Sequence, residues 1–107
     1  MTEAKLSKLI QIEVSKLGGR VFRNQSGLHL SLDGKRKVKT GLVKGSSDLI
    51  GWTATGQFLA IEVKTQNGRV SPEQQKFINA VNKAGGLAFV ARSIEDVEVK
   101  LNGLRRS

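Results

Sequence analysis

The chain has 107 residues, of which 38% are hydrophobic and 25% charged, the size and composition of one globular domain. It has no cysteine, which excludes disulfides and thiolate zinc sites, and no apolar run near the ~20 residues of a membrane span. Lysine and arginine outnumber aspartate and glutamate by 18 to 9, for a formal charge of +9, which favours nucleic acid as the partner.

The first half of the chain predicts one helix, one short strand and one hairpin. Residues 3–17 predict a helix, because apolar residues recur there at helical spacing, with Thr2 as cap and Gly18-Gly19 as stop. Residues 20–24 predict a short strand. Residues 28–40 alternate on both sides of Asp33-Gly34, a strong hairpin signal. The N-terminus lacks the apolar core of a signal peptide, so we expect a cytoplasmic protein.

The second half predicts a hairpin, two helices and a buried strand. Residues 48–64 read as two strands that turn at 53–56. Ser71, Pro72 and Gln74 predict a capping box with proline in the first helical position, and that helix reaches Gly85-Gly86. Residues 87–91 predict a buried strand, and 93–96 cap a last helix. This order predicts an α/β fold, a mixed central β-sheet flanked by helices, in a single domain over residues 1–107.

One predicted strand, residues 58–64, carries charges where burial is expected. Strand side chains alternate between two faces, so Leu59, Ile61 and Val63 share one face, while Glu62 and Lys64 end the other. A buried charge is costly unless it is paired or binds a metal. Either this face ends at solvent, with a surface ion pair worth about 0–1 kcal/mol, or the two residues serve a chemical function.

Asp48 gives the pair a chemical interpretation. It begins the neighbouring predicted strand, and paired strands lie about 4.8 Å apart, so its carboxylate can meet that of Glu62 at one cation. Mg²⁺ takes such oxygen ligands, and the main-chain carbonyl of Val63 could add another. Lys64 would then point at water or phosphate, as phosphodiester hydrolysis requires. Taken alone, Asp48 could equally be a turn residue.

Several segments together resemble a known nuclease family. The Asp…Glu-x-Lys pattern resembles the core of the PD-(D/E)XK nucleases, which have a restriction-endonuclease-like fold. The surroundings are similar to the VRR-NUC (virus-type replication-repair nuclease) domain over nearly the whole chain. Serine, not proline, precedes Asp48 here. The resemblance is carried by Glu3 on the predicted first helix and by the segments "FRNQSG", "KGSSDLIG", "AIEVKTQNGRVSPEQQKF" and "NKAGGLAFVARSIEDV".

The resemblance implies an active site of Glu3, Asp48, Glu62 and Lys64, with Gln74 close by. It implies dependence on Mg²⁺ or Mn²⁺, with Glu3 bound directly or through water. Small members of this kind are similar to Holliday-junction resolvases and act as homodimers on branched DNA. Helical periodicity alone does not choose between Glu3 and Glu13. Gln74 already has a structural role in its capping box.

The basic residues predict where DNA would lie. Residues 34–45 hold five cations and no acid, which favours contact with the phosphate backbone over an ordinary solvated loop. His29, the only histidine, is most simply structural, and Trp52 and Phe89 are most simply core. The predicted DNA-binding residues are Arg23, Asn24, Lys35, Arg36, Lys37, Lys39, Lys44 and Ser46.

Two functions from different classes fit these observations. The first is a metal-dependent DNA endonuclease. The second is a non-catalytic basic nucleic-acid-binding domain. Carboxylates that face a polyanion weaken binding unless a cation intervenes, so converging acids favour the nuclease. The sequence contains no P-loop and no Ser-His or Cys-His arrangement that would indicate a small-molecule enzyme.

The predicted hairpin at residues 28–40 holds Lys35, Arg36, Lys37 and Lys39 and is called the basic hairpin from here on. It gives a first testable prediction. Replacing Lys35, Arg36 and Lys37 with alanine should weaken DNA binding and flatten its dependence on salt, because fewer counterions are released, by roughly one unit of slope per lost phosphate contact. DNA affinity measured across a salt series tests this. An unchanged slope would remove the hairpin from the DNA-contact surface.

Overall fold

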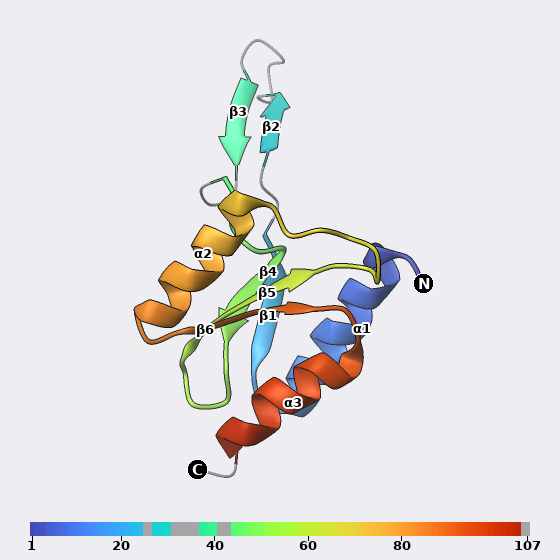
Figure 1. The fold of residues 1–107 in the computed structure, drawn as a ribbon, viewed down its shortest axis with the longest axis vertical. Coiled ribbons are helices and arrows are strands. Elements are labelled where there is room, and N and C mark those ends of the chain that lie inside the picture. The colour runs from blue at the N-terminus through green and yellow to red at the C-terminus, as the bar shows by residue number, and fades with distance from the viewer. Residues whose placement is uncertain (25–26, 31–36, 41–43, 106–107) are drawn as a thin grey trace.

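Three helices enclose a four-stranded sheet, and a separate two-stranded hairpin extends beyond one end of it (Figure 1). The computed structural model describes residues 1–24, 27–30, 37–40 and 44–105. The elements in chain order are α1 (Glu3–Lys16), β1 (Arg20–Arg23), β2 (Gly27–Leu30), β3 (Lys37–Thr40), β4 (Leu49–Trp52), β5 (Phe58–Val63), α2 (Pro72–Lys83), β6 (Leu87–Ala91) and α3 (Ile94–Arg105).

The main sheet has the order β1-β4-β5-β6 and is mixed. The pairs β1–β4 and β4–β5 are antiparallel, whereas β5 and β6 are parallel and joined by α2, as a parallel connection requires. The expected mixed sheet with flanking helices is confirmed. Both predicted hairpins are also confirmed. The tip at residues 33–34 lies outside the described residues, and the second hairpin turns where Gly56 N–H donates to the Thr53 carbonyl.

The helices begin where the sequence predicts. The Thr2 hydroxyl caps α1 by accepting from Lys5 N–H, and apolar residues of α1 face the sheet. At α2, Gln74 N–H donates to the Ser71 hydroxyl, and the Gln74 side-chain oxygen accepts from Ser71 N–H. The predicted capping box is therefore complete, with Pro72 in the first turn.

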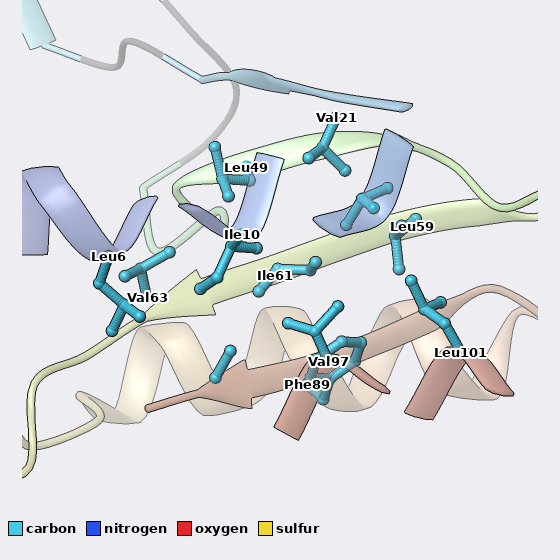
Figure 2. Packing of buried hydrophobic residues seen from close by; sticks show 12 residues of the cluster. Leu6, Ile10, Val21, Leu49, Leu59, Ile61, Val63, Phe89, Val97 and Leu101 are labelled. Carbon is cyan, nitrogen blue, oxygen red and sulfur yellow. The ribbon is translucent and has the colours of Figure 1, made fainter. Parts of the chain in front are cut away.

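Helices α1 and α3 cover one face of the sheet, and α2 covers part of the other (Figure 1). On the first face, Leu6 of α1 lies next to Val63, and Ile10 lies next to Leu49 and Ile61 (Figure 2). The start of α1 therefore sits at the end of β5. A smaller cluster joins α2 to the opposite face through Ala60, Ile78 and Ala88, with Ile50, Phe77, Val81 and Val90 packed against it.

One sequence expectation about the core is wrong. Phe89 is buried, as expected, but Trp52 is 46% exposed. Trp52 is on the face of the sheet that α2 covers, at the end of β4 distant from the beginning of α2, where no described helix reaches it.

Among the described residues, no helix is long and apolar enough to cross a membrane.

Gly45 ties the segment before β4 to the start of α2. It has φ of +87°, a left-handed conformation that favours glycine, and a Cβ there would lie 2.6 Å from the backbone of Glu73. The segment from Lys44 to Asp48 thus packs closely on the first turn of α2. Any larger residue at 45 has to move one of the two.

We predict that Gly45→Ala destabilises the fold clearly more than Gly56→Ala. Gly56 has nearly the same φ, +86°, but a Cβ there meets nothing within 4 Å, so it measures the conformational cost alone, about 1 kcal/mol. Denaturant unfolding of the two variants tests the difference. Equal losses of stability would mean that the contact with α2 does not constrain residue 45.

Candidate active site

Asp48 and Glu62 stand opposite each other on neighbouring strands. The β4–β5 register pairs Leu49 with Ile61, so one further step places Asp48 across from Glu62. Directly opposed residues point to the same face of a sheet. A hydrogen bond of 2.9 Å from Val63 N–H to the Asp48 Oδ2 holds this arrangement. The structure therefore brings together the two carboxylates that the sequence analysis paired.

The two carboxylates have opposite environments. Asp48 is exposed, whereas Glu62 is 1% exposed and lies in β5 between two other strands. The Glu62 Oε1 accepts a hydrogen bond of 2.8 Å from Gln74 Nε2 and lies 3.6 Å from the Lys64 Nζ. Its Oε2 is buried and accepts no hydrogen bond from any described residue. A buried carboxylate oxygen without a partner is costly, so it points to a ligand.

Gln74 performs both roles that the sequence left open. Its side-chain oxygen completes the capping box of α2, and its side-chain nitrogen donates to Glu62. The amide is therefore held at both ends, which fixes the Glu62 carboxylate relative to the beginning of α2. The start of this helix is a structural part of the site.

Lys64 follows β5 directly, and its side chain is largely buried beside Glu62, with 16% exposed. The loop after it is held by Arg92, whose guanidinium donates to the carbonyls of Thr65 and Gly68 at 2.7 and 2.8 Å. The sequence analysis missed Arg92, which lies 28 positions after Lys64 and carries no local signal. Its position at the end of β6, the parallel neighbour of β5, is the only clue that could have found it.

Asn24 braces the segment that carries Asp48. Its side-chain nitrogen donates to the Ser46 hydroxyl and to the Ser47 carbonyl, at 2.7 and 3.0 Å, and its N–H donates to the Asp48 carbonyl at 2.7 Å. Asn24 and Ser46, which the sequence analysis places against DNA, thus bond to each other. Their contact with DNA stays a prediction.

The structure does not place Glu3 in one metal-binding group with Asp48 and Glu62. Among the described residues, no group of three or more His, Cys, Asp or Glu side chains is placed to hold a metal ion. Glu3 is exposed in the first turn of α1, the end of the helix that lies next to Val63 (Figure 2). Glu13 is about 15 Å further along the helix axis, so of the two acids Glu3 lies at the end nearer the site. Its catalytic role stays a prediction.

The remaining predicted DNA contacts are placed only in part. Arg23 at the end of β1 and Lys44 are exposed, which leaves both accessible to a ligand. Positions 37 and 39 lie on β3, paired with positions 30 and 28 of β2. Lys35 and Arg36 lie outside the described residues.

Comparison with known proteins identifies the family. The model of the VRR-NUC domain matches residues 14–95, more than half of the chain. The chain belongs to the VRR-NUC family. A solved structure described as a VRR_NUC domain is 26% identical, with a TM-score of 0.61, and the alignment covers 91% of this chain and 90% of that one. No curated protein matches the chain.

A second solved structure, described as a VRR_NUC domain protein, shares the fold. It is 22% identical, with a TM-score of 0.56, and the alignment covers 98% of this chain and 86% of that one. The family match includes Asp48, Glu62, Lys64 and Gln74, but it begins after Glu3. VRR-NUC is a nuclease-type family, which implies DNA as the substrate.

The charges of this VRR-NUC site change the acidity of Glu62. Burial first, then the negative charge of Asp48 and a hydrogen bond from the protonated Glu62 to Asp48, together raise the pKa of Glu62 from 4.5 to about 7, although the Lys64 ammonium partly opposes them. The protein alone therefore holds an ionised Glu62 poorly at neutral pH. A cation between the two carboxylates would favour the ionised form and so lower the pKa of Glu62.

The residues of the VRR-NUC site fit a hard divalent cation. Two carboxylates meet at one point, one of them with a buried oxygen that lacks a partner. Val63 donates its N–H to Asp48, and the N–H and C=O of a strand residue point to the same side, so its carbonyl faces the same region. One or two carboxylates with added oxygens suit Mg²⁺.

The raised pKa of Glu62 predicts a pH-dependent stability that Glu62→Gln removes. The folded pKa lies above the ordinary value, so the contribution is complete below pH 4.5 and is lost as pH rises to about 7. In EDTA, wild type should lose about 2–3 kcal/mol relative to E62Q between about pH 5 and pH 8.

Chemical denaturation at the two pH values measures the difference. Glu95→Gln, which changes an exposed acid on α3, is the control and should follow the wild type. Parallel pH profiles for wild type and E62Q would contradict the account of Glu62.

Proposed function

We propose that this protein is a Mg²⁺-dependent DNA endonuclease that hydrolyses phosphodiester bonds, with Mn²⁺ able to replace Mg²⁺. The observation that carries the proposal is the buried Glu62 oxygen without a partner, opposite Asp48, in a chain of the VRR-NUC family. A protein that only coats DNA would gain nothing from burying a carboxylate there. The burial makes sense if a cation is bound during function.

Asp48 and Glu62 would hold the cation, with the Val63 carbonyl as a further oxygen and Glu3 contributing directly or through water. When bound, the cation supplies Lewis acidity, which polarises the phosphate and makes water more acidic. Asp48, on the exposed side, is the carboxylate that the DNA strand approaches. Its bond from Val63 N–H keeps it oriented when the strand arrives.

Lys64 would stabilise charge on the phosphate, and Gln74 would orient the Glu62 carboxylate. The Lys64 ammonium, 3.6 Å from Glu62, is placed to stabilise negative charge that grows on the phosphate during attack by water. Gln74 holds the Glu62 carboxylate in one rotamer through its 2.8 Å bond. Because the same amide caps α2, this orientation is in place before substrate binds.

The proposal extends to a homodimer acting on branched DNA such as a Holliday junction. Each chain carries one candidate site, whereas a junction or duplex presents two strands, so paired cuts require two copies. A two-fold dimer is the commonest arrangement of two identical chains. The basic hairpin β2–β3 extends beyond the sheet at the end where α2 begins and would lie along the phosphate backbone (Figure 1).

Asp48→Asn and Lys64→Ala should each reduce DNA cleavage in Mg²⁺ by at least about 100-fold, because one loses a cation ligand and the other a charge that stabilises the transition state. Gel assays on a labelled four-way junction, a flap and a linear duplex, with Mg²⁺ and with EDTA, measure this. Lys76→Ala, which removes an exposed cation from α2, controls for net charge and should cut normally.

The same two variants distinguish the proposed role of Asp48 as a cation ligand from that of Lys64 as a stabilising charge. Mg²⁺ should raise the melting temperature of wild type and Lys64→Ala but not of Asp48→Asn, since only the last loses a ligand. DNA binding in EDTA should survive in both. Cleavage at the wild-type rate by either variant would refute the site, and DNA binding without cleavage on every substrate would leave the non-catalytic binding domain.

A further inference from the structure

Three of the five aromatic residues of this chain are half-exposed and lie together. Phe22, Trp52 and Phe58 are 51%, 46% and 44% exposed, whereas Phe89 is buried and Phe77, on α2, packs against the cluster between α2 and the sheet. The rings of Phe22 and Trp52 are 5.7 Å apart at their centroids and tilted by 58°. We call Phe22, Trp52 and Phe58 the aromatic patch. Exposing this much aromatic surface in a small domain indicates a binding role.

The strand register places the aromatic patch on one face of the sheet. Trp52 pairs with Phe58 across β4 and β5, and Phe22 pairs with Ile50 across β1 and β4. Opposed residues share a face, and Ile50 and Ala60 belong to the cluster under α2, so this is the α2 side of the sheet. Helix α2 packs on the middle of β5 and β6 and against Ile50 of β4, and no helix in the described part of the chain covers the three half-exposed rings.

The candidate active site lies on this same face. Asp48 and Trp52 are four residues apart on β4 and therefore point to the same side. Their separation along the strand is about 13 Å, roughly four stacked nucleotides at 3.4 Å each. A strand whose phosphate reaches Asp48 and Glu62 can thus continue along β4 to the aromatic patch without leaving the face.

The charges around the aromatic patch suit a polyanion. Residues 49–61, which form β4, the turn and most of β5, contain no charged residue. The charged residues of the neighbouring strand β1 are both cations, Arg20 and Arg23. Exposed Arg20 lies directly opposite Trp52. Exposed aromatic rings with an arginine beside them can stack on unpaired bases, and the arginine can contact their phosphates.

We infer that the aromatic patch binds unpaired nucleotides of the DNA substrate by stacking, next to the strand segment cut at Asp48 and Glu62. This inference rests on the proposed nuclease function and specifies its substrate as DNA with a single-stranded segment beside the cut. Bases inside a duplex are already stacked on each other, so they cannot use the aromatic patch. Among branched substrates, flaps and forks therefore gain a contact at the aromatic patch, whereas a fully paired junction would reach Asp48 and Glu62 without it.

A second copy of this chain is the competing occupant. The charged residues next to the rings on β1 are cations, which attract a DNA strand. The cation Arg20 beside the rings would also face its own copy across a two-fold contact. The charges therefore favour nucleic acid.

Trp52 is the only tryptophan of the chain, so its fluorescence reports directly on the aromatic patch. Titration of the full chain in EDTA with a short oligothymidylate should quench the fluorescence, and titration with a blunt duplex should quench it far less. Phe22→Ala and Trp52→Ala should weaken binding of the oligothymidylate by roughly 5- to 100-fold, measured by anisotropy of a labelled oligonucleotide. Trp52→Phe should retain most of the affinity, and Val99→Ala, which removes an exposed apolar side chain from α3, should retain all of it.

The outcomes separate this inference from the proposed function. Cleavage by the wild type with unchanged oligothymidylate affinity in both alanine variants would overturn the stacking inference and leave the nuclease standing. The inference would also fall if Trp52→Ala turned a dimer into a monomer, by light scattering, without changing that affinity. Stacking without cleavage of any substrate would instead contradict the nuclease.

Discussion

The site depends on a carboxylate that the fold holds inside its sheet. Glu62 is buried in β5 with one oxygen bonded to Gln74 and the other without a partner among the described residues. A single ammonium 3.6 Å away does not balance it, because Asp48 faces it from the next strand. A positive charge at this point would lower the free energy of the folded protein, and the proposed divalent cation would provide it.

The rest of the scaffold keeps the two carboxylates opposed. Asn24 and the N–H of Val63 hold Asp48 from the neighbouring strands, and Gln74 holds Glu62 from α2. Gly45 lets the segment before Asp48 pack on the first turn of that helix. These contacts come from residues far apart in the sequence, so the site forms only when the sheet and α2 are assembled. Such prior orientation would let the protein bind the proposed cation and phosphate without reorganising.

Local chemistry explains what the sequence could predict. The period of two in residues 58–64 and the Ser71-to-Gln74 capping box are set by near neighbours, so strand, helix start and the Asp48–Glu62 pairing followed from them. Contacts between distant segments were out of reach. Asn24 gave no hint that it bonds to Ser46, and Trp52 looked like a core residue because a strand pattern does not say how much of a sheet face a helix will cover. Glu3 and Glu13 lie toward opposite ends of α1, and only tertiary packing decides which end of the helix lies next to β5.

The most direct test is anomalous X-ray diffraction from crystals of the protein soaked in Mn²⁺. The account predicts one anomalous peak between the strands, with oxygens of both Asp48 and Glu62 within about 2.0–2.3 Å of it, and no such peak in crystals of Glu62→Gln. A wild-type crystal saturated with Mn²⁺ that shows no peak there, with Glu62 still bonded only to Gln74 and Lys64, would contradict it.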